Sequence, residues 1–130
     1  MKNNNYISDE EFTKFLESIE GLENGFFKDE DPIKERGFFC VGNGWLGLVK
    51  TLIEDLITLG WDKQICQVKQ KFGGLRFYIN DGSKEIFEKI TEAEKKSYEV
   101  CEKCGEPGNP TKGGWITTLC DPHLYEKLNR

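Results

Sequence analysis

The amino-acid sequence predicts an α+β fold: a small antiparallel sheet centred on one β-hairpin, about three helices, and a Cys/His-rich finger at the C-terminus. Three observations carry this prediction. Two runs of alternating apolar and polar residues flank a Gly-Gly pair in QVKQKFGGLRFYIN, which is typical of a hairpin. Apolar residues at helical spacing lie before and after it. A C-x-x-C pattern followed by C-x-x-H is typical of a metal-binding finger.

The chain length of 130 residues predicts one domain spanning residues 1–130. We expect an α+β body at 1–100, with the finger, residues 101–130, packed on it as a subdomain. The start MKNNNYISDEEF lacks the apolar run of a signal peptide, and no segment approaches the ~20 apolar residues of a membrane span. A cytoplasmic protein with reduced thiols is therefore expected.

The first helix is predicted at residues 9–20. Ser8 followed by Glu11 forms a capping box, in which the two side chains bond the first N–H groups of the helix. The apolar residues behind this cap recur at helical spacing and are expected to face the core: Phe12, Phe15, Leu16, Ile19 and Leu22.

Two further helices are predicted in the body. Residues 45–59 are apolar on nearly every face, which indicates a central buried helix. Asn43 is expected to cap its start and Gly60 to end it. Ser83 is expected to cap a third helix that runs to about Tyr98. The side chains expected to point inward from it are Ile86, Phe87, Ile90, Ala93 and Ser97 or Tyr98.

The hairpin register decides which side chains share a face. If Gly73 and Gly74 form the two-residue turn, Val68 faces Ile79 and one face of the hairpin is mainly apolar. The opposite face then carries the basic and aromatic side chains Lys69, Lys71, Arg76 and Tyr78, called here the hairpin face. Residues 37–41, GFFCV, are expected to add a third short strand.

Charge is unevenly distributed along the chain. The net charge is −5, yet residues 63–80 contain four basic residues and no acidic one. An acidic protein with one basic segment is a poor candidate for general nucleic-acid coating. The hairpin face could serve solubility alone, or it could bind an acidic protein patch, a phosphate or a nucleotide base.

The finger contains two pairs of metal-ligand residues. Cys101 and Cys104 form a C-x-x-C knuckle, and Cys120 and His123 form a C-x-x-H pair. A predicted strand at WITTL lies between the pairs, and a helix is expected to begin at DPHLYEKLN. This order resembles the treble-clef zinc finger. Three thiolates and one imidazole complete a tetrahedral shell and leave no position for substrate, so a structural Zn²⁺ is expected.

No active site is expected elsewhere in the sequence. The chain has one histidine, which is assigned to the metal, so a treble-clef nuclease would lack its general base. Cys40 and Cys66 lie in apolar stretches and are expected to be buried, unreactive thiols. Trp115 follows two glycines and is expected to pack over the zinc knuckle, the alternative being a ring free to bind a ligand.

Four segments together resemble a family of small proteins encoded in bacterial and bacteriophage genomes, whose function is unassigned. They are GNGW, QVKQKFGGLRFYI, AEKKSYEVCEKCGEPG and GGWITTLCDPH, and the resemblance covers residues 42–123. It implies a phage or prophage setting, and by analogy inhibition of a bacterial defence or regulatory factor.

The expected function is therefore non-enzymatic binding of a bacterial protein, by a domain that a structural zinc stabilises. The alternative is a zinc-finger nucleic-acid or nucleotide binder that uses the finger and the hairpin together. A small metal-dependent nuclease is the third possibility.

Overall fold

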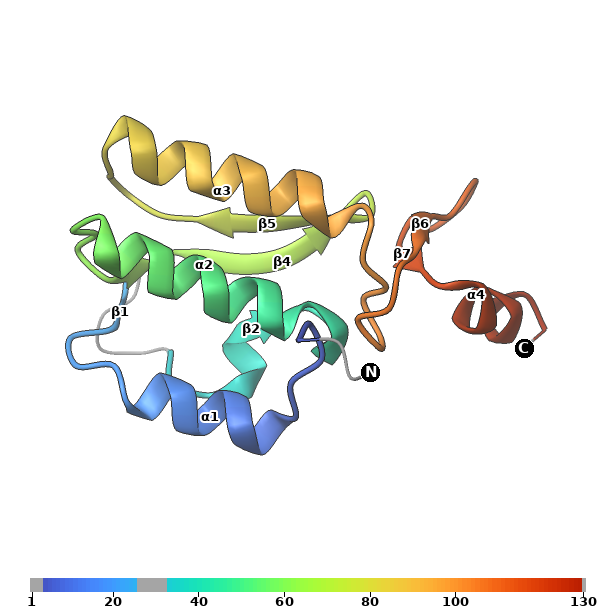
Figure 1. Ribbon diagram of the computed structural model, residues 1–130, viewed down its shortest axis with the longest axis horizontal. Helices are drawn as coiled ribbons and strands as arrows, with labels where there is room; N and C mark the ends of the chain where they lie inside the picture. Colours follow the sequence, from blue (N-terminus) through green and yellow to red (C-terminus); the bar gives the residue numbers. More distant parts are fainter. Residues whose placement is uncertain (1–3, 26–32, 130) are drawn as a thin grey trace.

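The computed structural model describes residues 4–25 and 33–129 (Figure 1). Within them lie four α-helices: α1 Asp9–Glu17, α2 Leu46–Thr58, α3 Lys84–Ser97 and α4 Asp121–Leu128. The strands are short: β1 Glu23–Asn24, β2 Phe39–Cys40, β3 Gln64–Ile65, β4 Gln67–Lys71, β5 Gly74–Tyr78, β6 Asn109–Pro110 and β7 Thr118–Leu119. The predicted α+β class is confirmed, with four helices in these residues where about three were expected. None of these helices is long and apolar enough to cross a bilayer.

The largest sheet has the strand order β2-β4-β5. Strands β4 and β5 form the predicted antiparallel hairpin, and β2 is the short third strand expected at residues 37–41. However, β2 runs parallel to β4, so the sheet is mixed rather than antiparallel throughout. The reason is the connection: the chain crosses through α2 between the two strands, and such a crossover brings the second strand back in the same direction.

The hairpin turn consists of Phe72 and Gly73, so the predicted Gly73-Gly74 turn is wrong by one residue. Both turn residues have positive φ, at 54° and 83°, as a two-residue hairpin turn of type I′ requires. Gly74 is the first residue of β5, and a Cβ there would collide with the ring of Tyr98. Lys71 therefore faces Gly74, and Val68 faces Phe77 instead of Ile79.

The partner of each β4 residue thus moves by two positions. Since side chains alternate with a period of two, every strand residue stays on its predicted face. The exception is Phe72, which leaves the apolar face for the turn and is 65% exposed.

Two of the three predicted helix caps are present. The Ser8 hydroxyl accepts a hydrogen bond from the Glu11 amide at 3.2 Å, and the Ser83 hydroxyl accepts one from the Ile86 amide at 3.3 Å. Asn43 does not cap α2, because a 3₁₀ turn, Asn43–Trp45, precedes that helix. Its side-chain amide donates instead to the Ile7 carbonyl, which ties the N-terminal segment to this turn.

The core lies between α2, the inner face of the sheet and the flanking helices α1 and α3 (Figure 1). Phe87 is 45% exposed, so its predicted inward position is wrong. The largest fully buried apolar side chains are Trp45, Phe12, Phe39, Leu16, Leu46, Ile53, Leu56, Ile65, Leu75, Val49 and Val68. Removing each such side chain from water contributes about 1.5–3 kcal/mol to stability.

Candidate metal centre

The four predicted metal ligands lie together at one end of the molecule. The ligand atoms of Cys101, Cys104, Cys120 and His123 are all within 4.8 Å of one another. All five cysteines are free thiols, so no disulfide competes for these sulfur atoms. The four residues therefore lie close enough to hold a single metal ion.

Three of the six separations between these atoms are somewhat shorter than the edges of a tetrahedral site, and the others do not exceed 4.8 Å. The Sγ atoms of Cys104 and Cys120 are 3.6 Å apart. His123 Nδ1 lies 3.4 Å from the sulfur of Cys101 and 3.0 Å from that of Cys120. Tetrahedral bonds of ~2.3 Å to sulfur and ~2.0 Å to nitrogen give edges of about 3.8 Å between sulfurs and about 3.5 Å from sulfur to nitrogen. The donor set consequently fits a small divalent cation that prefers sulfur and imidazole.

Local sequence places the second ligand pair on a helix start. Cys120 is the N-cap of α4, and Pro122 occupies the first turn, where its missing N–H costs nothing. His123 follows Cys120 by three residues, a spacing that brings two side chains to the same side of a helix. The prediction of a helix beginning at DPHLYEKLN is confirmed.

Two thiols of the cluster have pKa values that are shifted in opposite directions. Burial acts to raise the pKa of the Cys101 thiol, but hydrogen bonds from the backbone of Cys120, Cys104 and Lys103 outweigh it and lower this pKa to about 7. Burial, followed by the adjacent thiols of Cys101 and Cys120, raises the pKa of Cys104 to about 12. A cation bound between these residues would favour the thiolate form of the sulfur ligands.

The GNGW loop at the start of α2 holds the knuckle against the body. The amide of Gly44 donates to the Glu102 carbonyl at 2.8 Å, and the amide of Gly42 donates to the Glu102 carboxylate at 3.0 Å. The buried indole of Trp45 donates to the Val100 carbonyl at 2.7 Å. A Cβ on Gly44 would collide with knuckle backbone, so only glycine fits there. The docking role of the GNGW motif was not predicted from the sequence.

The hairpin turn contacts the other side of the finger. The Thr118 hydroxyl donates to the Gly73 carbonyl at 2.7 Å in a buried position. The Gln70 side-chain amide donates to the Ile116 carbonyl at 3.1 Å. The N-terminal segment adds a third contact, because the Asn5 side-chain amide donates to the Gly105 carbonyl at 2.9 Å. The finger thus rests on three separate segments of the body.

The hairpin face brings its four predicted residues onto one side of the sheet. Lys69 lies directly opposite Arg76, and Lys71 and Tyr78 are exposed. Arg76 forms an ion pair with Glu94 at 2.8 Å, and the Arg76 side chain is only 23% exposed. The outward positive charge of this face therefore comes mainly from the two lysines.

The two cysteines outside the finger differ in environment. Cys66 is buried as predicted, and its thiol lies 3.1 Å from the Asn80 amide oxygen. Burial, reinforced by the nearby Asp62 carboxylate, raises the pKa of this thiol. Cys40 is exposed, so its predicted burial is wrong. The parallel register explains the difference, since it places Cys40 beside Lys69 on the outer face of the sheet.

Trp115 does not pack over the knuckle, and this prediction is also wrong. Its ring is 78% exposed. Gly113 and Gly114 both have positive φ and form the bend that precedes it. The backbone at this position is anchored instead: the Lys127 ammonium donates to the Trp115 carbonyl at 2.8 Å.

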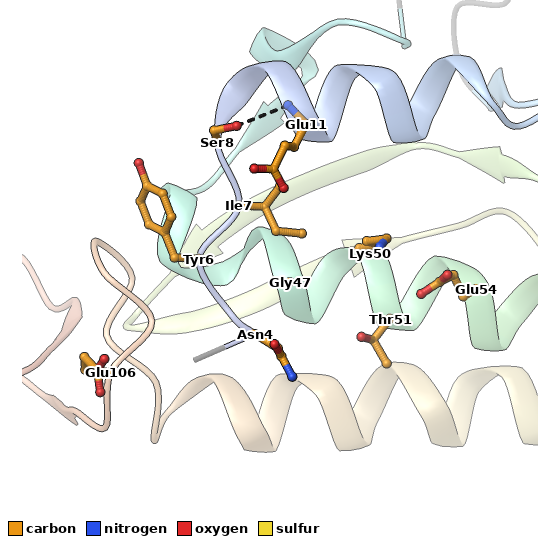
Figure 2. Close-up of a pocket in the computed structure, with 10 residues that line it drawn as sticks. All are labelled: Asn4, Tyr6, Ile7, Ser8, Glu11, Gly47, Lys50, Thr51, Glu54 and Glu106. Atoms are coloured by element: carbon orange, nitrogen blue, oxygen red, sulfur yellow. Dashed lines mark hydrogen bonds between the residues drawn. The ribbon is translucent and has the colours of Figure 1, made fainter. Parts of the chain in front are cut away.

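A hollow of about 850 Å³ lies between the N-terminal segment and α2. Figure 2 shows Glu11, Lys50 and Glu54 at its wall, with Glu106 of the finger at its far end. No histidine or cysteine is among its described lining residues. We find no group here that could act as a nucleophile paired with a histidine base.

Comparison of the chain with protein-family models, curated proteins and solved structures found no significant match. Functional inference therefore depends on the geometry of the chain's own residues.

Proposed function

We propose that Cys101, Cys104, Cys120 and His123 bind one structural Zn²⁺ in a finger of the treble-clef kind. The observation that carries this proposal is that three sulfurs and one nitrogen, the donors of a tetrahedral zinc shell, lie within 4.8 Å of one another. Such a shell is complete with protein ligands alone, so the metal would stabilise the finger and have no open position for a substrate.

Metal analysis tests this proposal directly. Protein purified without chelator should contain one zinc per chain, measured by inductively coupled plasma mass spectrometry. Protein without stoichiometric metal, yet with a folded finger, would contradict the assignment.

We further propose that the chain is a non-enzymatic, cytoplasmic binding protein of the phage or prophage type. Its partner would be a bacterial protein with an acidic surface, such as a defence or regulatory factor that it inhibits. The supporting observation is the hairpin face, where Lys69, Lys71 and Tyr78 present positive charge and an aromatic ring on a protein of net charge −5.

Charge reversal on this face tests the binding proposal. A partner is first captured from bacterial lysate and purified, and its affinity is then measured for the double variant Lys69→Glu, Lys71→Glu. Affinity should fall at least tenfold, which corresponds to about 1.4 kcal/mol. The thermal midpoint should change little, because exposed charges contribute about 0–1 kcal/mol per pair. Arg76 is left unchanged, since reversing it would set two acids side by side at Glu94.

Lys112→Glu is the matched control, because this exposed lysine lies on the finger and its reversal changes the net charge in the same direction. Its affinity should equal that of the wild type. Undiminished binding by the double variant would place the interface elsewhere on the molecule.

A further inference from the structure

A groove of about 460 Å³ lies between the sheet and the finger, apart from the metal ligands. The body contributes Cys40 and Gln70 to its lining, and the finger contributes Glu102, Lys103, Trp115 and Lys127. Its volume falls within the range of roughly 300–1,000 Å³ that is usual for small-ligand sites.

The charges in this groove favour an anion. Lys103 is exposed on the knuckle, and the ammonium of Lys127 bonds a neutral carbonyl, which leaves its charge uncompensated. The carboxylate of Glu102 also lines the groove, but both of its oxygens are engaged: one accepts from the Gly42 amide at 3.0 Å and the other from the Thr117 hydroxyl at 2.9 Å. Two cations therefore line the groove beside one carboxylate that is already hydrogen-bonded.

The aromatic wall of the groove is the exposed ring of Trp115. The chain's other tryptophans, Trp45 and Trp61, are 0% and 4% exposed, whereas Trp115 is 78% exposed. Lys127 fixes the Trp115 carbonyl, so the ring projects from an anchored backbone. A flat apolar surface of this kind, beside two ammonium groups, matches a ligand that is both planar and anionic.

We propose that this groove binds a nucleoside phosphate, with the base stacked on Trp115 and the phosphate held between Lys103 and Lys127. Gln70 also lines the groove, and because its amide already bonds the Ile116 carbonyl and the Gly73 amide, it shapes the wall of the groove. A free nucleotide and the terminal nucleotide of a single strand share this chemistry. An acidic peptide would use the lysines but has no planar group to stack on the indole.

Tryptophan fluorescence tests the proposal, because quenching by added ligand reports on Trp115 while the two buried indoles contribute a constant background. Adenosine 5′-monophosphate should quench saturably. Adenosine alone and inorganic phosphate alone should each bind at least tenfold more weakly, since each satisfies one half of the site. A tetranucleotide of thymidine distinguishes a free nucleotide from the end of a single strand. If the tetranucleotide binds more than tenfold more tightly than the mononucleotide, the ligand is a strand; otherwise the ligand is a free nucleotide.

Lys103→Glu should weaken binding of the mononucleotide at least tenfold, whereas the matched control Lys112→Glu should not. As a second measurement, the mononucleotide should slow alkylation of Cys40, which lines the groove and is exposed. Retained zinc and an unchanged circular dichroism spectrum ensure that each variant is folded.

Several results would overturn the proposal. They are the absence of saturable quenching by both the mononucleotide and the tetranucleotide, equal weakening by the two lysine variants, or equal affinity for hexaglutamate and the mononucleotide.

Discussion

Substituting Gly44 by alanine would separate docking of the finger from binding of the proposed zinc. A Cβ at this position would lie 2.5 Å from the Gly105 nitrogen and 2.7 Å from the Glu102 carbonyl oxygen, and it would overlap the Cys101 carbonyl oxygen. These are backbone atoms of the knuckle, which no side-chain rotation moves aside. The knuckle must therefore shift away from the body.

The magnitude follows from the contacts that this shift disturbs. The hydrogen bonds from Gly44 and Gly42 to Glu102 and from Trp45 to Val100 each contribute about 0.5–1.5 kcal/mol. Overpacking of a well-packed site costs about 1–3 kcal/mol. Partial retention of the hydrogen bonds leaves an expected loss of about 3 kcal/mol, a large share of the ~5–15 kcal/mol that holds a typical domain folded.

Urea denaturation of the zinc-loaded protein measures this loss. Gly37→Ala is the control, because a Cβ there would meet nothing within 4 Å. Its stability should match the wild type closely. The Gly44→Ala variant keeps all four ligands and should retain one zinc per chain. A free energy of unfolding within about 0.5 kcal/mol of the wild type would refute the docking role of this loop.

Four further outcomes are expected. Cys104→Ser should lose stoichiometric zinc and loosen the finger, because the free energy of metal binding helps to fold such modules. Metal analysis measures the loss of zinc, and limited proteolysis measures the loosening. Ser97→Ala removes the buried acceptor of the Leu75 amide, bonded at 2.9 Å, and should cost about 1–3 kcal/mol in urea denaturation. Hydrogen bonds from Asn43 and then Arg36 hold the pKa of Asp9 below its ordinary value of 3.8. The ionised Asp9 therefore stabilises the fold above pH 3.8, and this stabilisation is lost as the pH falls through the lower pKa of the folded state. In urea denaturation, an Asp9→Asn variant should be less stable than the wild type above pH 3.8 and equally stable below the folded pKa. Incubation with DNA or RNA and Mg²⁺ or Mn²⁺ should leave the nucleic acid intact, as gel electrophoresis would report.

The features that the sequence predicted well depend on residues close together in the chain. Ser8 and Ser83 cap helices through the amide three residues later, so a short window contains the whole interaction. The cysteine and histidine spacings likewise contain most of the metal geometry, since a knuckle and a helix start position each pair locally. The alternation of side chains along β4 and β5 assigns each residue to the correct face of the sheet, even though the predicted register was wrong.

The features that it missed depend on residues far apart. Two consecutive glycines permit two turn frames, and the sequence near them does not show that Gly74 packs in a strand against Tyr98, the C-cap residue of α3. Exposure of Cys40 follows from the parallel pairing of β2, which only the crossover through α2 establishes. Trp115 resembles a core residue by composition, but it follows the bend at Gly113 and Gly114 and is exposed, which its own sequence does not reveal.

The proposed groove couples the two parts of the molecule, and this coupling provides a last test. Its ring and ammonium groups come from the finger, while Cys40 and Gln70 come from the body, so the groove is complete only when the finger is docked. A nucleotide that binds the docked state at a hundred times its Kd would stabilise that state by about 2.7 kcal/mol. If zinc leaves only after undocking, adenosine 5′-monophosphate should slow its transfer to a chelator by up to about a hundredfold. Lys103→Glu should abolish this protection without changing the rate in the absence of nucleotide. If zinc transfer from the wild-type protein were as fast with saturating nucleotide as without it, the groove and the metal would not be linked through docking.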